Sequence, residues 1–139
     1  TAFDSVGHHV LAHQESRIAS GQYDAAHENI EYIVKTMKLL GCEEALPEAL
    51  RLKGLCALCI NNSNGLEAES YFQESLQESR KHKSEVWELR TSVSLARFWG
   101  ENQEREKAYD LLYSKYNSYT EGLDTPLLQE ADTLLKELR

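Results

Sequence analysis

The stretch IEYIVKTM at residues 30–37 decides the fold class of this chain. Its apolar residues Ile30, Ile33, Val34 and Met37 recur three and four positions apart, so they share one face of an α-helix. The same helical spacing recurs before and after it, at Val6 and Val10, at Leu52, Leu55 and Leu58, and at Tyr71, Phe72 and Leu76. The chain has only seven glycines and two prolines, so few breakers interrupt this pattern. It predicts an all-α protein.

Turn signals divide the helical pattern into seven segments. They lie at Gly21, at Gly41 with Pro47 after it, at 61–65, at 83–84, at 100–102 and at Gly122 before Pro126. The predicted helices cover residues 4–20, 22–40, 46–61, 65–82, 84–100, 103–119 and 125–138.

Short connections between successive helices favour antiparallel pairing. The sequence therefore predicts one domain over residues 1–139, with hairpins at about 4–40, 46–82 and 84–119 and a capping helix at about 125–138. One hairpin does not bury its own apolar face, so we expect the hairpins to stack into a right-handed superhelix. Because the sequence starts at Thr1 without a methionine, we expect it to be a fragment of a larger protein.

Small residues recur where paired helices would approach closely. Ala96 and Ala108 are twelve positions apart, which resembles the offset of the two small positions of a tetratricopeptide repeat. Gly54 and Ala68 are fourteen apart, with the additional residues falling in the Asn-rich segment at 61–64. The turn GQYDAA at 21–26 resembles the G-x-Y-x-x-A turn of the same repeat.

Longer strings strengthen this resemblance. They are LKGL at 52–55, AESYFQESL at 68–76, WELRTSVSLAR at 87–97 and TEGLDTP at 120–126. Together they resemble the C-terminal tetratricopeptide region of large bacterial signalling proteins, over about residues 21–139. In that family a class III adenylate or guanylate cyclase domain, or a LuxR-type DNA-binding domain, precedes an AAA-like ATPase and then this helical tail.

The resemblance implies a regulatory role without catalysis, because cyclase and ATPase activity belong to domains upstream of the tail. No glycine-rich phosphate loop followed by Lys-Ser or Lys-Thr occurs in the sequence. No nucleophilic serine sits in a G-x-S-x-G turn either. We therefore expect no catalytic residues, no cofactor and a function in binding a protein, a peptide or a small effector.

Charge and cysteine content narrow the class of partner. The net charge of −8 is shared by both halves of the chain, which disfavours direct binding to nucleic acid or to an anionic membrane. Three cysteines, without a secretory signal or a long apolar segment, favour a reducing cytoplasm.

In tetratricopeptide geometry the first helix of each hairpin lines the concave face. This placement predicts a partner-binding face at Glu48, Arg51, Leu55, Arg90, Val93 and Arg97. The three arginines would form a basic strip suited to a carboxylate, an acidic peptide or a phosphate. Two alternatives stay open: the arginines pair with neighbouring glutamates, or the module mainly mediates self-association through exposed apolar positions of its first hairpin.

Two further motifs have the residue types of metal or redox sites. His8, His9 and His13 include a pair one helical turn apart, but three histidines on a terminal helix are more often simply exposed, so we predict no metal site. Cys56 and Cys59 have C-x-x-C spacing without a second pair. Because they fall inside a helix, we interpret both as packing residues.

Overall fold

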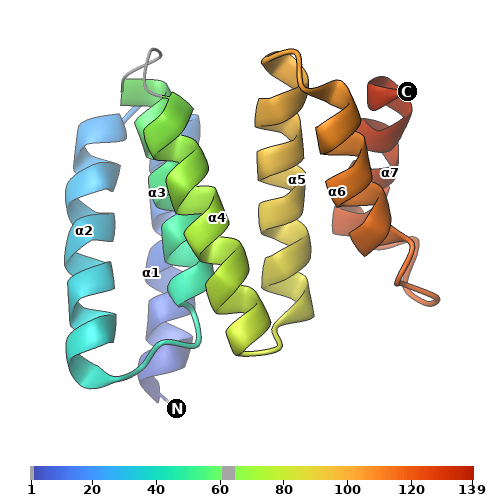
Figure 1. Ribbon diagram of the computed structural model, residues 1–139. Coiled ribbons are helices and arrows are strands. Elements are labelled where there is room, and N and C mark those ends of the chain that lie inside the picture. The colour runs from blue at the N-terminus through green and yellow to red at the C-terminus, as the bar shows by residue number, and fades with distance from the viewer. Residues whose placement is uncertain (1, 61–64) are drawn as a thin grey trace. The chain divides into compact units, whose positions relative to one another are not determined.

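The computed structural model describes residues 2–60 and 65–139, with side chains described from His9 onward on the N-terminal side. The Asn-rich segment at 61–64 and the side chain of His8 therefore lie outside the described residues. Within them the chain is all-helical, as predicted, and no residue is in a strand. The helices, shown in Figure 1, are α1 (Ala2–Ala19), α2 (Tyr23–Leu40), α3 (Leu46–Ile60), α4 (Gly65–Lys81), α5 (Glu85–Glu101), α6 (Arg105–Tyr116) and α7 (Pro126–Leu138).

The helix boundaries agree with the predicted ones to within three residues. Gly41 ends α2 in the left-handed conformation, with a φ of 69°, and the N–H of Cys42 donates to the carbonyl of Met37. That conformation favours glycine, which lacks the Cβ that would clash. The largest difference is at α6, which ends at Tyr116 instead of residue 119. The Ser118 hydroxyl there donates to the carbonyl of Lys115, a local bond that competes with the helix.

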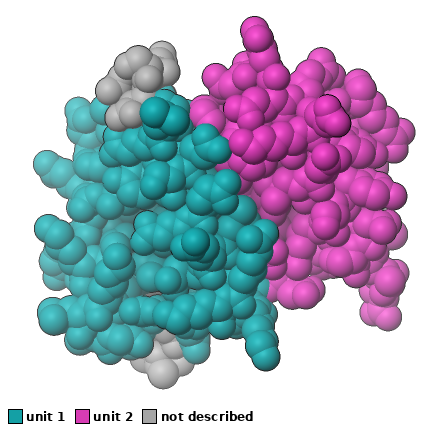
Figure 2. Space-filling model, viewed as in Figure 1, with its two compact units in different colours: residues 1–84 teal, residues 85–139 magenta. Residues whose placement is uncertain are grey.

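The chain divides into two compact units, residues 1–84 and residues 85–139, which Figure 2 colours separately. The first unit contains α1 to α4 and the second contains α5 to α7.

The first unit is held together by α3, which packs against α1, α2 and α4. Pattern residues of α2 enter its core, including Ile30 and Met37, both almost fully buried. The other members of this core share full or nearly full burial and are Leu11, Ala26, Val34, Ala45, Leu46, Ala49, Leu50, Leu52 and Cys56.

The α3–α4 contact is close because Gly54 has no side chain. A Cβ on Gly54 would lie 2.7 Å from Cε1 of Phe72, whose ring is fully buried. One turn before Phe72, Ala68 is also fully buried. Farther along, the Ser75 hydroxyl donates to the carbonyl of Pro47 at 2.7 Å, so a hydrogen bond fastens α4 to the start of α3. The small residues Gly54 and Ala68 are thus buried in the hairpin of α3 and α4, as the sequence pattern predicts.

In the second unit all three helices contact one another, and α7 packs against both α5 and α6. The predicted small residues Ala96 and Ala108 are fully buried. Helix α7 starts at Pro126, whose missing N–H costs no hydrogen bond at this position. Its buried face consists of Leu128, Ala131, Leu134, Leu135 and Leu138.

Candidate functional site

The predicted partner-binding residues lie on two helices in different units. Glu48, Arg51 and Leu55 belong to α3 of the first unit, and Arg90, Val93 and Arg97 belong to α5 of the second. Their surroundings differ strongly, so each group is described in turn.

Arg51 is buried, with only 6% of its surface exposed. Its Nε donates to Oε1 of Glu48 at 2.6 Å, and its Nη2 donates to Oε2 of Glu48 at 3.1 Å and to Oε2 of Glu15 on α1 at 2.7 Å. Burial disfavours the guanidinium charge, but the hydrogen bonds and charges of Glu48 and Glu15 outweigh it and raise the pKa of Arg51. Arg51 thus has the glutamate pairing that the sequence analysis left open.

A second cation of α3, Lys53, is also held within the first unit. Its Nζ lies 2.6 Å from Oε1 of Glu31 on α2 and 4.6 Å from the centre of the Tyr71 ring on α4. The hydrogen bond from Lys53 lowers the pKa of Glu31. The two cations of α3 therefore pair with glutamates of the neighbouring helices α1 and α2. The third predicted residue on α3, Leu55, carries no charge.

On α5 the three predicted residues have three different degrees of exposure. Val93 is buried in the second unit, and Arg90 is half-buried with its guanidinium 5.9 Å from the centre of the Trp87 ring. Arg97 is exposed, and its Nη2 lies 3.1 Å from Oε1 of Glu130 on α7. Because an exposed ion pair of this kind contributes only about 0–1 kcal/mol, Arg97 can exchange Glu130 for a ligand at little cost.

Arg97 also lines a pocket in the second unit with a volume of about 190 Å³. The pocket lies between the C-terminal ends of α5 and α7 and the start of α6. Its lining residues are Arg97, Gly100, Glu101, Arg105, Leu134, Glu137 and Leu138. Two arginines, two glutamates and two leucines thus surround one small hollow.

Arg105, the first residue of α6, also lines this pocket, although no repeat pattern in the sequence indicated it. Its Nη2 donates to the main-chain carbonyl of Glu137 and, at 3.4 Å, to that of Arg139. A cation at a helix N-terminus faces the positive end of its own helix dipole, which is unfavourable. Carbonyls at the C-terminal end of α7 compensate for this, since that end is negative. The unfavourable position of Arg105 was the signal in the sequence that it has a partner elsewhere.

The two residues of the C-x-x-C motif differ in exposure. Cys56 lies in the core of the first unit, where burial, with a contribution from Cys59, raises the pKa of its thiol to about 11. Cys59 is exposed, and both thiols are free. The packing interpretation therefore describes Cys56 and is wrong for Cys59.

Two residues of the histidine motif of α1, His9 and His13, are exposed. The rings of His9 and His13 meet edge to face with their centres 5.4 Å apart. Among the described residues, three potential metal ligands come together elsewhere, at Glu43, Glu78 and His82 of the first unit.

Comparison of the chain with known proteins gives no indication of its function. No family model, no curated protein and no solved structure matches the chain. Within residues 2–60 and 65–139, none of the helices has both the length and the apolar character needed to cross a bilayer.

Proposed function

We propose that the chain is a tetratricopeptide-like, non-catalytic interaction or effector-sensing module that regulates a bacterial cytoplasmic signalling protein, a nucleotide cyclase or a transcription regulator. In this proposal the second unit binds a carboxylate of an acidic peptide or small effector. The observation that carries it is that Arg97 and Arg105 line one pocket.

The repeat pattern supports the tetratricopeptide-like part of the proposal. Four alanines at small positions, Ala26, Ala68, Ala96 and Ala108, are fully buried, and Gly54 lies against Phe72. Small side chains at these positions let the two helices of a hairpin approach closely. A stack of these hairpins is typical of modules that bind partners.

The chemistry of the pocket supports a carboxylate as the ligand. Guanidinium groups bind carboxylates through paired N–H donors, and Arg105 keeps unused donors because a guanidinium has five. Glu101 and Glu137 bring two negative charges to the same pocket, which disfavours a multiply charged phosphate group. Its volume of about 190 Å³ is also below the roughly 300–1,000 Å³ of common ligand pockets. A single carboxylate group carries only one negative charge and is small enough for this volume.

Removing the exposed arginine should weaken binding of an acidic probe. We expect Arg97→Ala to raise the Kd for L-glutamate, or for a peptide ending in two glutamates, by about tenfold, the loss of roughly 1.4 kcal/mol expected from one charge-assisted contact. Isothermal titration calorimetry measures this effect.

A matched control is Lys136→Ala, which removes an exposed cation of α7 that pairs with Asp132 and does not line the pocket. It should leave the Kd unchanged. If neither probe binds, or if Arg97→Ala and Lys136→Ala weaken binding equally, the pocket is not the effector site.

Self-association is a second candidate function, favoured by the outer face of α2. Leu39 is 85% exposed and Tyr32 is 73% exposed, and their spacing of seven places them on the same face of the helix. Leu40, beside them, is 57% exposed. Large apolar side chains grouped on one exposed face are typical of protein interfaces.

A charge placed on this face tests the second candidate. If copies of the chain associate through α2, Leu39→Lys should weaken the dimer at least about tenfold, because a buried charge would replace apolar contact. Leu66→Lys on α4 is the control, since Leu66 is 83% exposed and lies on another helix. Analytical ultracentrifugation measures both, and a monomeric parent chain at high concentration would rule self-association out.

A further inference from the structure

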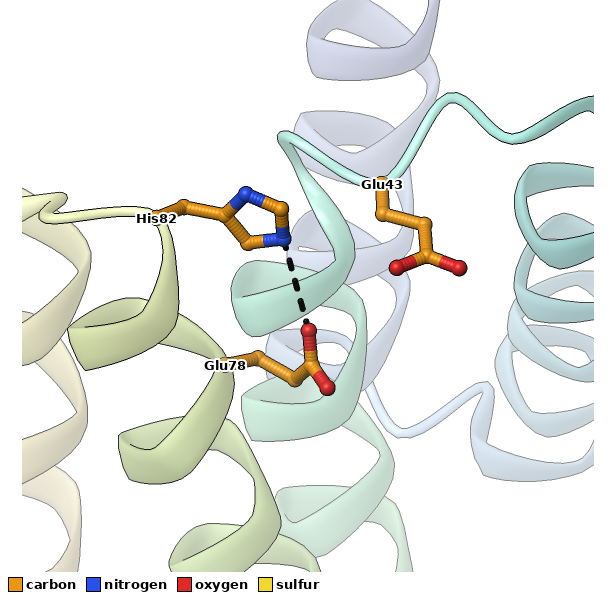
Figure 3. Close-up of side chains that lie close together, drawn as sticks. All are labelled: Glu43, Glu78 and His82. Carbon is orange, nitrogen blue, oxygen red and sulfur yellow. Dashed lines mark ion pairs between the residues drawn. The ribbon is translucent and has the colours of Figure 1, made fainter.

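We propose that Glu43, Glu78 and His82 form a binding site for a divalent transition-metal ion, with Zn²⁺ as the best fit. One ligand atom from each side chain lies within 4.8 Å of the other two. Figure 3 shows the three side chains extending toward one another, Glu78 from α4, His82 from the turn directly after it, and Glu43 from the connection between α2 and α3. The site is independent of the function proposed for the second unit, because all three residues belong to the first.

One pair of ligand atoms has the separation found in a tetrahedral metal centre. Glu78 is on α4, and His82 follows the last residue of that helix, where its N–H still donates to the carbonyl of Glu78. Residues four apart in such a turn lie on one side, and Nε2 of His82 is 3.5 Å from Oε2 of Glu78. Zinc bonds to nitrogen and oxygen are about 2.1 Å long, which places two ligand atoms of a tetrahedron roughly 3.4 Å apart. This pair is already at that separation. The Glu43 carboxylate lies within 4.8 Å of both atoms and would have to move closer to complete the site.

A buried oxygen in the cluster needs a positive partner. Oε2 of Glu78 is inaccessible to solvent and accepts no hydrogen bond from the described residues. Its contact with Nε2 of His82 is an ion pair at 3.5 Å, longer than a usual hydrogen bond, and a metal ion would satisfy the oxygen more directly. The same oxygen is the one that faces Nε2 of His82.

Competition from other charges at the site is weak. Nζ of Lys81 lies 3.9 Å from Oε2 of Glu43, at the outer limit for an ion pair, and its side chain is 64% exposed. Such a contact contributes little, so a divalent ion can replace it. Because His82 is exposed, a metal ion can also reach the site from solvent.

The ligand set favours zinc over the common hard cations. Ca²⁺ and Mg²⁺ prefer ligand sets made of oxygen, whereas Zn²⁺ takes histidine nitrogen together with carboxylate oxygen. Three protein ligands leave a fourth position for water or for an acidic group of a partner. An ion bound by the three side chains would link the α2–α3 connection to the C-terminal end of α4. It should therefore stabilise the folded chain.

The test is a zinc titration of chelator-treated protein in a Cys42→Ser/Cys59→Ser background, which removes the two thiols outside the core. Calorimetry should show one Zn²⁺ per chain. Zinc at a hundredfold excess over Kd should raise the Tm by about 5–10 °C. The absorption bands of Co²⁺ in the visible range give a second readout of four-coordinate geometry.

Single substitutions decide whether these three residues hold the ion. Glu43→Gln, Glu78→Gln and His82→Ala should each weaken zinc binding more than about tenfold, while His9→Ala/His13→Ala should not. Thermal melts without metal confirm that each variant folds. The proposal is overturned if zinc does not bind, if binding depends on His9 and His13, or if Glu43→Gln leaves the affinity unchanged.

Discussion

Replacing Arg51 with methionine is expected to lower the free energy of unfolding by about 3–5 kcal/mol, the usual cost of removing one partner from a buried ion pair. The Glu48 side chain is only 9% exposed and receives two hydrogen bonds from Arg51. Without the guanidinium, the buried Glu48 carboxylate would lose both of these hydrogen bonds and the positive charge beside it. Urea denaturation followed by far-UV circular dichroism measures the loss.

The double variant Arg51→Met/Glu48→Leu provides the control. It removes both buried charges and keeps apolar volume, so it should recover most of the stability lost in Arg51→Met. Glu15 needs no compensation, because its side chain is 44% exposed and remains solvated. If Arg51→Met is as stable as the parent chain, Arg51 has no structural role, and its predicted role in partner binding becomes the better interpretation.

Replacing Gly54 with leucine is expected to destabilise the first unit by about 3 kcal/mol, the upper part of the range for overpacking a core. The added Cβ alone would meet Cε1, Cδ1 and Cζ of Phe72 at 2.7, 2.9 and 3.0 Å. The ring is fully buried, so it could move only by displacing its neighbours in a close-packed core. Helices α3 and α4 would have to separate. Gly54→Ala should show a smaller loss of the same sign, since its gain in helix propensity of about 1 kcal/mol offsets part of the clash.

Gly100→Ala is the matched control for Gly54→Ala. A Cβ there would meet only Cδ2 of Leu138, at 2.8 Å, and that atom is the free end of a flexible side chain. Gly54 is in the interior of α3, whereas Gly100 is the penultimate residue of α5, so the gain in propensity is smaller at Gly100. Gly100→Ala should therefore be within about 0.5 kcal/mol of the parent chain. Equal losses in the two alanine variants would show that α3 and α4 do not depend on a close approach at Gly54.

The candidate sites depend on contacts that the sequence pattern did not contain. Helical spacing placed Arg51 on α3, but the carboxylate of Glu15 that binds it comes from 36 positions earlier in the chain. The pocket around Arg97 required Arg105 from α6 and Glu137 from α7. Likewise, Glu43 reaches Glu78 and His82 only because the α2–α3 connection lies against α4.

The sequence by itself determined that the described chain is all-helical and where its helices begin and end. These features depend on hydrogen bonds between residues about four positions apart and on local breakers such as Gly41, so a short window of sequence contains the necessary information. It also indicated close approaches at small residues such as Gly54. Only the tertiary structure decided which charges meet, because the partners of Arg51, Arg97 and Glu78 depend on how separate helices pack and on which side chains that packing buries.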